Sequence, residues 1–461
     1  MSAKPCILIA DPVSTGRLYV DDIIRRGYEP IVLMPWLEEP DEMVEAMYEY
    51  RYTPMLRSLP KGIKIIWEKP DYQQTLEEIK KYPIELAISG NEMGINTIDR
   101  ITHDLGLKGN PIEFSQSRRD KDVMQAALKK AGLRHISGRK VKSVEDAKAF
   151  LDETGIEDAI VKPINGAGSS GLHYCSSREE ILEAVEHDQD HFYLYANPEK
   201  GLIVQERMIG DEYVVNTVSC NGKHVITDIW EYRRVCLRFD GNIYDRVTLV
   251  TELDPKHIAL CEYALSVVES LGIKNGPSHG EYMIDEKGPV LIECGARPMG
   301  GAMPQSFLDK ALGHHITDIS LDSYLDPKAF AEFASKPYRP KCSAMMKFRI
   351  SKRDRTVADV PLHEIVKNLP SVHVTKIGRL EEHAPIKRTT DVDTSPGTLF
   401  MVHEDDAVME RDYQIILDLE STCDSMLFGL DDLELENLNE TSWNASDALA
   451  EVEYGFGEGA Y

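Results

Sequence analysis

Two glutamates, Glu281 and Glu293, are spaced so that they could hold a metal ion together. Between them, two apolar runs flank the tetrapeptide Asp-Glu-Lys-Gly, and this pattern predicts a β-hairpin. A type I turn with Gly288 in the left-handed conformation and a G1 bulge would place Asp285 opposite Pro289. Counting outward from that pair, the hairpin places Glu281 directly across from Glu293, with Cβ atoms roughly 4.5–5.5 Å apart.

Opposed carboxylates destabilise a hairpin, and a cation bound between them would reverse the sign of that interaction. Arg297 follows shortly after Glu293, so these residues together form a candidate Mg²⁺–phosphate site. A solvent-facing hairpin end with incidental acids is the structural alternative. His279 has the same strand parity as Glu281 and could face the same site, or it could be a structural histidine.

A glycine-rich segment, residues 164–171, is a second candidate for phosphate binding. It follows a short apolar strand, residues 159–163, which contains Lys162. Its three glycines, with Ser169 and Ser170, would let backbone N–H groups and hydroxyls approach a polyphosphate closely. The segment returns to a strand, whereas a P-loop enters a helix. Lys162 needs a counter-charge if it points inward. A mobile hairpin loop is the structural alternative.

Residues 202–215 read as a strand, a short polar break and another strand. Such a hinge suits adenine, with edge hydrogen bonds from the backbone and Met208 against the face of the ring. Glu212 could accept hydrogen bonds from ribose hydroxyls. Lys121 stands at the start of a helix predicted for residues 122–131, where it is either a ligand or a solvated lysine.

Two further features could contact a ligand. Residues 232–247 are predicted to be a polar loop that contains four arginines, Arg233, Arg234, Arg238 and Arg246. In an acidic protein these arginines indicate a carboxylate or phosphate substrate, with a solvated loop as the alternative. Glu92 follows a predicted strand, and it either faces a ligand or stabilises the start of a helix.

The length of the chain, 461 residues, predicts two to four domains. Residues 1–114 alternate strand and helix signals, which predicts an open parallel α/β sheet. A dinucleotide-binding fingerprint of glycines is missing after the first strand. After Ser320 the pattern indicates α+β material. From Phe428 to Tyr461 there are nine acids and no Lys or Arg, which predicts a flexible tail.

The net charge of −26 argues against binding to nucleic acid or to an anionic membrane surface. No apolar run approaches the length of a transmembrane helix, and the first residues lack the features of a signal peptide. The eight cysteines show no Cys-x-x-Cys spacing, so we expect free thiols in a reducing cytoplasm.

The order and spacing of five motifs resemble the ATP-grasp carboxylate–amine ligases, and most of all the L-amino-acid ligases that make dipeptides. The likeness covers roughly residues 7–420. The motifs are Gly90-Asn91-Glu92 with Gly106-Leu107-Lys108-Gly109-Asn110, Arg119-Asp120-Lys121, Val161-Lys162-Pro163 with Ser169-Ser170-Gly171, Val204-Gln205-Glu206 through Gly210-Asp211-Glu212, and Gly280-Glu281 through Glu293 to Arg297.

The resemblance implies a fold and five parts. The expected fold class is α/β and α+β: an ATP-grasp fold with an N-terminal open parallel α/β domain, a two-lobed ATP-binding centre and a small C-terminal α+β domain. The expected parts are an N-terminal domain, a small lobe with the glycine-rich loop, a large lobe with the metal site, a C-terminal subdomain and an acidic tail, at residues 1–114, 115–204, 205–325, 326–425 and 426–461.

The resemblance also implies roles for single residues. On the nucleotide side, it implies two lysines that hold the ATP phosphates, a loop that closes over them, an adenine hinge and a ribose acceptor. These residues are, in that order, Lys121 and Lys162; Ser169, Ser170 and Gly171; Gln205, Glu206 and Met208; and Glu212.

On the reacting side, the resemblance implies that Glu281 and Glu293 bind Mg²⁺, with Mn²⁺ as an alternative ion. Arg297 resembles the arginine that steadies the acyl phosphate or the substrate carboxylate. Lys162, Arg297 and His279 are the candidate catalytic residues. Many ATP-grasp enzymes place an Asn where this chain has Gly295, so the ligand set for two ions is short by one residue, although Glu293 could bridge both ions.

The implied reaction is the ATP-dependent joining of a small carboxylic acid to an amine, with release of ADP and phosphate. Amino acids are the expected substrates, and a homodimer is an open arrangement. Two alternatives are a non-catalytic ATP-binding scaffold on the same fold and a ligase acting on a peptide or on bicarbonate.

Overall fold

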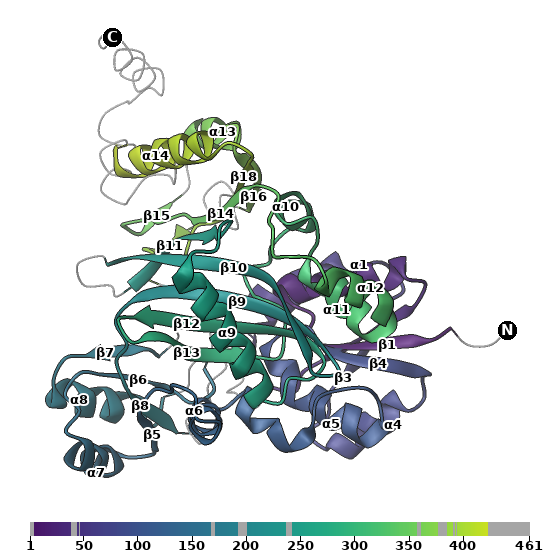
Figure 1. Ribbon diagram of the computed structural model, residues 1–461, viewed down its shortest axis with the longest axis horizontal. Helices are drawn as coiled ribbons and strands as arrows, with labels where there is room; N and C mark the ends of the chain where they lie inside the picture. The colour runs from purple at the N-terminus through teal and green to yellow at the C-terminus, as the bar shows by residue number, and fades with distance from the viewer. Residues whose placement is uncertain are drawn as a thin grey trace, which may run out of the picture.

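The computed structural model describes residues 4–422, apart from residues 38–43, 46, 167–170, 192–200, 237–241, 357–360, 377–384, 391 and 393. Figure 1 shows the N-terminal α/β part beside a long central sheet, with a small lobe at the lower left and C-terminal helices at the top. The predicted acidic tail, residues 426–461, lies outside the described residues.

The N-terminal part is a parallel four-stranded sheet in the order β3-β2-β1-β4. Its strands are β1 Cys6–Ala10, β2 Glu29–Met34, β3 Lys64–Trp67 and β4 Ile84–Ser89. Helices α1 Leu18–Arg25, α3 Thr53–Ser58, α4 Tyr72–Ile79 and α5 Ile95–Leu105 belong to this part, with short turns η1 Ser14–Arg17, η2 Tyr48–Tyr52 and η3 Glu92–Gly94. Every residue of β1 is buried, as its continuous apolar sequence requires in a sheet covered on both faces. The predicted open parallel sheet is confirmed.

The small lobe is an antiparallel four-stranded sheet in the order β5-β8-β6-β7. Its strands are β5 Gly138–Val141, β6 Ala159–Pro163, β7 His173–Cys175 and β8 Leu202–Glu206. Helices α7 Val144–Thr154 and α8 Arg178–Asp188 pack on this sheet through an apolar core. Each of these helices is preceded by a serine, Ser143 or Ser177. The serine hydroxyl accepts a hydrogen bond from a backbone N–H in the first turn and so caps the helix. The turns η4 Ile112–Phe114 and η5 Gln116–Arg118 and the helix α6 Lys121–Lys130 precede the lobe.

The central sheet has eight strands in the order β13-β12-β9-β10-β11-β14-β18-β16. Its first five strands are β9 Asp211–Cys220, β10 Lys223–Cys236, β11 Asn242–Leu249, β12 Gly276–Asp285 and β13 Gly288–Gly295. Helix α9 Pro255–Ser270 packs on one face of these strands (Figure 1). Helices α10 Gln305–Ala311, α11 Ile316–Leu325 and α12 Pro327–Ala334 follow the sheet.

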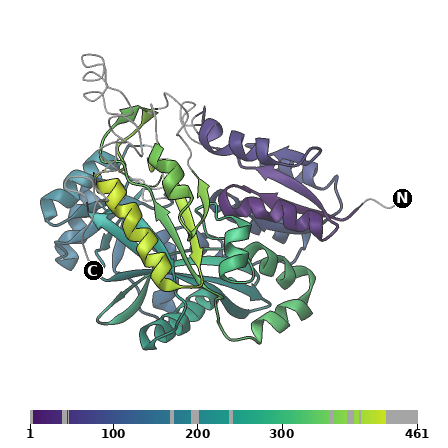
Figure 2. The same cartoon turned by 90° about the horizontal axis from the view of Figure 1, so that it is seen from above.

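The last three strands of the central sheet come from the C-terminal part of the chain. They are β14 Ser343–Phe348, β16 Val372–Lys376 and β18 Thr398–His403. Two short strands, β15 Arg355–Thr356 and β17 Pro385–Ile386, pair with each other, and helices α13 Pro361–Lys367 and α14 Asp406–Thr422 complete this part. Figure 2 shows α14 lying across these strands, and its apolar side chains share a core with β14 and β18.

The prediction of a polar loop over residues 232–247 is wrong for the described residues, because 232–236 and 242–247 form the paired ends of β10 and β11. Along β11, the side chains of residues 243, 245, 247 and 249 are buried and alternate with partly exposed ones. The polar residues that resembled a loop, such as Arg234 and Tyr244, line a cavity on the sheet. Arg238 lies outside the described residues.

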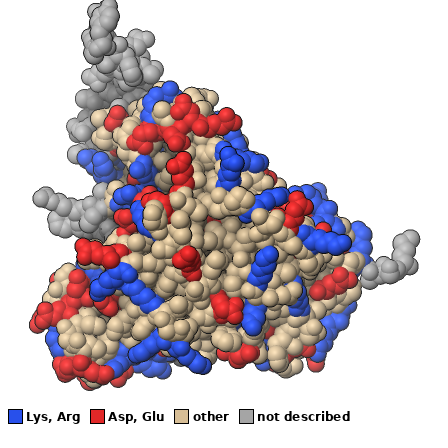
Figure 3. Space-filling model, in the orientation of Figure 1, with Lys and Arg blue, Asp and Glu red and all other residues tan. Residues whose placement is uncertain are grey.

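The surface mixes charges of both signs. On the face drawn in Figure 3, the side chains of Lys and Arg are interspersed with those of Asp and Glu. Six cysteines in the described part of the chain are free, and four of them are buried. Within the same residues, no helix combines the length and the apolar character needed to cross a membrane.

Candidate active site

A cavity of about 400 Å³ lies between the small lobe and the central sheet. It brings together ten of the residues expected from the sequence: Lys121, Lys162, Gln205, Glu206, Met208, Glu212, His279, Glu281, Glu293 and Arg297. Gly171 has a φ of 69° and is not among the lining residues. Ser169 and Ser170 lie outside the described residues.

The hairpin that carries the two glutamates has a different turn from the expected one. Asp285 pairs with Gly288, so the predicted pairing of Asp285 with Pro289 is wrong. Gly288 does adopt the predicted left-handed conformation, with a φ of 97°. Arg134 holds this turn through a bidentate ion pair, in which its two terminal nitrogens lie 2.7 and 2.5 Å from the carboxylate oxygens of Asp285.

The predicted pairing of Glu281 with Glu293 is nevertheless confirmed. The pairing shifts by one residue between Tyr282 and Glu281, because Tyr282 lies opposite Leu291 whereas Glu281 lies opposite Glu293. A β-bulge on β13 therefore compensates for the shorter turn. It leaves both carboxylates at the wall of the cavity.

Glu281 is held in its charged form by its neighbours. Burial raises the pKa of this carboxyl, but the hydrogen bond with His279 and the positive charges of Arg234 and Arg297 lower it to about 2. The second carboxylate, Glu293, forms an ion pair with Lys121 at 3.1 Å. Both carboxylates of the hairpin thus have positively charged or hydrogen-bonding neighbours in the cavity.

His279 is buried next to Glu281, and its hydrogen-bond partners indicate which ring nitrogen carries a proton. The side-chain N–H of Asn216 donates to Asp228, so the Asn216 Oδ1 accepts from His279 Nδ1 at 2.9 Å. The other nitrogen, Nε2, lies 3.3 Å from Glu281 Oε1. Burial and the charge of Arg297 lower the pKa of His279, while Glu281 raises it. When the ring is neutral, Nε2 and the carboxylate are both acceptors, so the contact is favourable only with a proton or another cation beside it.

Two lysines form the opposite wall. Lys162 lies on β6 and is 8% exposed, and burial together with the nearby charge of Lys121 lowers its pKa to about 8. The charges of Glu293, Glu281 and Glu212 act in the opposite direction, and they are the counter-charges that an inward-pointing lysine requires. Lys121, at the start of α6, also donates to the backbone oxygen of Gly166 at 2.9 Å. Paired buried lysines favour an anion between them.

One end of the cavity has the character of a purine site. Gln205 is 2% exposed, and its Nε2 has no hydrogen-bond partner among the described residues. Its neighbours in the cavity wall include the apolar side chains of Ile136, Ile160, Met208 and Ile292. A buried amide donor without a partner costs free energy, which a ring nitrogen of a bound base would recover. The backbone N–H of Glu206 already donates to the Ser137 oxygen at 2.8 Å.

Glu212 forms an ion pair with Arg234, a residue that was predicted to lie in a loop. Arg234 Nε and one terminal nitrogen donate to the two oxygens of Glu212 at 2.7 and 2.6 Å. The guanidinium of Arg234 also lies 4.1 Å from the centre of the Tyr244 ring. Each oxygen of Glu212 keeps a second lone pair, so this ion pair is compatible with acceptance of a ribose hydroxyl.

Sequence reasoning left the role of Glu92 open and missed its partners. Glu92 is buried and joins two arginines, with Arg297 Nε at 2.7 Å from one oxygen and an Arg119 nitrogen at 3.2 Å from the other. Burial raises the pKa of Glu92, but Arg297 and Arg119 hold it at about 2. Arg297 lines the cavity whereas Glu92 does not, so Glu92 orients Arg297 from behind. No local pattern reveals a contact that spans 205 residues of sequence.

The same contact explains the glycine that departs from the family pattern. A Cβ atom added at Gly295 would lie 3.1 Å from Glu92 Oε2, which is closer than an ordinary van der Waals contact. A side chain at this position would require the Glu92 carboxylate to shift by a few tenths of an ångström. Gly295 therefore leaves room for the ion pair between Glu92 and Arg297.

Comparison with protein-family models identifies an ATP-grasp domain at residues 157–305. This chain contains an ATP-grasp domain. Its fold resembles that of the L-amino acid ligase from Bacillus licheniformis, with a TM-score of 0.68 and 17% identity over 90% of this chain and 97% of that one.

Two relatives of this chain are ligases or synthases by name. Dapdiamide A synthase of Enterobacter agglomerans is 27% identical over 352 residues, which cover 75% of this chain and 81% of the relative. Alanine–anticapsin ligase of Bacillus subtilis strain 168 is 25% identical over 286 residues, or 56% of this chain and 59% of the relative. The predicted ATP-grasp fold, the use of ATP and the enzyme class of carbon–nitrogen ligase are confirmed.

Proposed function

We propose that this protein joins the carboxylate of one amino acid to the amine of another, with cleavage of ATP to ADP and phosphate. The observation that carries the proposal is the meeting of two buried lysines, two opposed carboxylates and Arg297 in one cavity. The names of the relatives, which include an alanine ligase and an L-amino acid ligase, support amino acids as the substrate class.

The nucleotide fits the cavity by the chemistry of its walls. The unpartnered amide of Gln205 and the apolar surface around Met208 suit adenine, and Glu212 suits the ribose. Lys121 and Lys162 lie where they would neutralise the phosphates. The glycine-rich segment with Ser169, Ser170 and Gly171 keeps its proposed role as the loop over those phosphates.

The paired carboxylates fit a divalent ion. Glu281 and Glu293 offer hard oxygen ligands at neighbouring positions on a sheet, which is the donor set that Mg²⁺ prefers and Mn²⁺ accepts. When bound, the ion would neutralise charge on the phosphoryl group. The negative charge of Glu281, kept at a pKa of about 2, is available to such an ion at neutral pH.

The reaction balances in two steps. A carboxylate oxygen of the first amino acid attacks the γ-phosphorus, and the bond to ADP breaks to leave an acyl phosphate. The amine nitrogen of the second amino acid then attacks the carbonyl carbon, loses one proton, and expels phosphate. Lys162 and Arg297 carry the positive charge that stabilises the transferring group, and His279 contacts Glu281, the carboxylate that would bind the ion.

A phosphate-release screen tests this proposal. Purified full-length protein with Mg²⁺ and ATP is incubated with pools of amino acids, and free phosphate and ADP are measured. We expect release that requires two amino acids, and mass spectrometry should show the coupled product. Glu293→Ala serves as the inactive control, with its fold checked by circular dichroism.

The alternatives give different outcomes in the same screen. Release with bicarbonate or with a peptide acceptor, but not with amino-acid pairs, would replace amino acids as the substrate class. No release under any condition, together with tight ATP binding, would favour the non-catalytic scaffold. The scaffold alternative gives no reason to keep both lysines, both glutamates and Arg297, because nucleotide binding alone needs few of them.

A further inference from the structure

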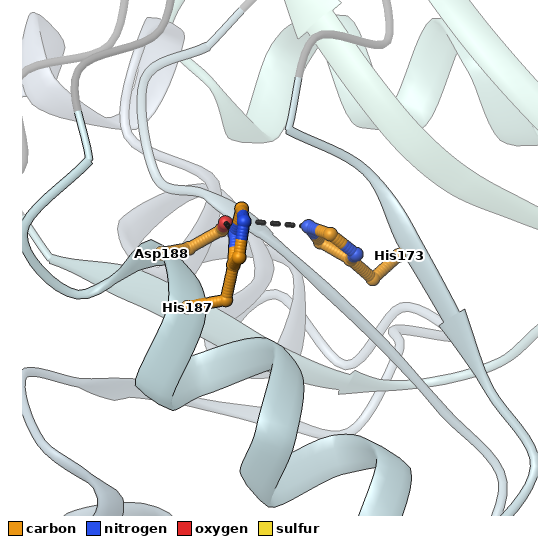
Figure 4. A group of neighbouring side chains, drawn as sticks. All are labelled: His173, His187 and Asp188. Carbon is orange, nitrogen blue, oxygen red and sulfur yellow. Dashed lines mark hydrogen bonds and ion pairs between the residues drawn. The ribbon is translucent and has the colours of Figure 1, made fainter.

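A second cluster of chemically reactive side chains lies on the small lobe. His173 belongs to β7, whereas His187 and Asp188 end helix α8. Figure 4 shows the two imidazole rings and the carboxylate turned toward one another. One ligand atom from each of the three side chains lies within 4.8 Å of the others. These residues do not line the ATP cavity, although Leu172 and Tyr174, which flank His173 in the sequence, do.

The carboxylate is the centre of this cluster. The side chain of Asp188 is 0% exposed, and its two oxygens face different imidazoles. His173 Nε2 lies 2.8 Å from Oδ2, the contact drawn as a dashed line in Figure 4, and His187 Nδ1 lies 2.6 Å from Oδ1. Protons bridge these contacts in the metal-free protein. A metal ion in place of these protons would require the two imidazole rings to move slightly away from the Asp188 carboxylate. Both rings are partly exposed, so they have room to move.

A third histidine, His191, lies beside this cluster. His191 follows His187 by four residues. Its backbone N–H donates to the backbone oxygen of Asp188, the last residue of α8, at 3.1 Å. The rings of His187 and His191 are stacked, with their centres 5.8 Å apart. His191 thus lies just beyond the end of α8, next to His187.

We propose that His173, His187 and Asp188 form a site for a divalent transition metal of the Zn²⁺ type. Imidazole nitrogens and one carboxylate are a donor set for Zn²⁺, Ni²⁺ or Co²⁺. Mg²⁺ binds oxygen ligands instead, so the cation of this site differs from the one proposed between Glu281 and Glu293.

The site connects an edge strand of the small lobe with the end of a helix. Strand β7 is an edge strand of the small lobe and pairs only with β6, the strand that carries Lys162. A metal ion bound by His173 and His187 would fix β7 to the end of α8. The site would then stabilise the lobe that carries one wall of the nucleotide cavity.

Zinc binding to the full-length protein tests the proposal. The protein is dialysed against a chelator and then titrated with Zn²⁺ in an excess of Mg²⁺, and bound zinc is measured by equilibrium dialysis with elemental analysis. We expect one Zn²⁺ per chain in this site. The double variant His173→Gln/His187→Gln should bind it at least about tenfold more weakly, because it loses two ligands. Zn²⁺ should raise the unfolding temperature of the wild type but not that of the double variant.

A matched control separates this site from incidental histidine binding. His103 also contacts a single carboxylate, with its Nδ1 2.9 Å from Asp104, so His103→Gln removes a similar pair elsewhere on the chain. This variant should bind zinc as the wild type does. Equal zinc binding by the wild type and the double variant, or no binding by the wild type, would overturn the proposal. Neither measurement involves nucleotide, so the outcome is independent of the proposed ligase activity.

Discussion

The side chains of the cavity change one another's chemistry more than their own types would suggest. Lys162 has a pKa of about 8 because it is buried near Lys121, and Glu281 has one of about 2 because His279 and two arginines offset its burial. A site with a weakened cation on one wall and strongly held anions on the other is ready for a charged ligand. Phosphates restore the charge of the lysine, and a metal ion satisfies the acids.

The pKa of Lys162 predicts how ATP binding depends on pH. An anionic ligand favours the charged lysine, so the pKa rises in the complex and ATP affinity falls as pH increases above about 8. The decrease should approach about tenfold per pH unit. Calorimetric titration of the protein with ATP between pH 7 and 10 measures it. Lys162→Arg, which stays charged throughout, should remove most of this dependence. An unchanged dependence in that variant would assign it to another group.

Replacement of Arg297 should affect catalysis more than nucleotide binding. Arg297→Ala removes a positive charge that we place at the transferring group, and we expect turnover to fall about 100-fold or more. The dissociation constant for ATP should change much less. Steady-state phosphate release and nucleotide titration together make the comparison. Equal losses in both would instead identify Arg297 as a nucleotide ligand.

At the level of elements, the N-terminal part is fastened to the rest of the chain by a buried histidine. His315, which precedes α11, has one ring nitrogen 2.6 Å from Asp309 and the other 3.2 Å from Asp22 on α1. Burial lowers the pKa of His315, but the hydrogen bonds to Asp22 and Asp309 raise it overall. Burial likewise raises the pKa of Asp22, and His315 with Thr317 lowers it overall. The contact therefore stabilises the fold through its charged form.

This contact predicts a pH window for stability. A raised histidine pKa contributes stability below its ordinary value of 6.5, and the contribution is lost as pH rises through the folded value. A lowered aspartate pKa contributes above 3.8, and that contribution is lost as pH falls through its folded value. The free energy of unfolding of His315→Gln should therefore differ most from wild type between these limits, and less toward pH 9. Urea unfolding measures it, and a constant difference across pH would contradict the charged contact.

The elements also show which parts of the site a sequence can reveal. Glu281 and Glu293 were paired correctly because alternation along two strands is a local property, and a bulge corrected the error in the turn. The strand ends at 232–236 and 242–247 were missed because some of their polar residues face a cavity, which a sequence cannot distinguish from solvent. The contact of Glu92 with Arg297 joins different parts of the fold, so no periodicity indicates it.

At the scale of the whole molecule, the cavity lies between two separate sheets. Lys162 comes from the small lobe and Glu281 and Glu293 from the central sheet. A ligand in the cavity would therefore contact the small lobe and the central sheet at once, and its binding should stabilise both. The domain boundaries at residues 114, 204, 325 and 425, a cytoplasmic location and a homodimer remain predictions.

Nucleotide with Mg²⁺ should raise the thermal stability of the full-length protein. A ligand at 100 times its dissociation constant adds about 2.7 kcal/mol to the free energy of unfolding. We expect a higher unfolding temperature with Mg²⁺-ATP, and a smaller rise when a chelator removes the ion. Differential scanning fluorimetry measures both. In the double variant Glu281→Gln/Glu293→Gln, the chelator should make no further difference. A chelator effect of full size in that variant would place the ion elsewhere.

The ion pairs of Glu92 have a consequence for recombination between relatives. Glu92 belongs to the N-terminal α/β part, whereas Arg119 and Arg297 lie beyond it in the sequence. A chimaera that exchanged residues 1–114 for those of a family member without an acid at this position would leave two arginines near the cavity without their counter-ion. A side chain in place of Gly295 would also press on the Glu92 carboxylate, which would have to shift. Segments around residues 92 and 295 are therefore interchangeable only as a matched set.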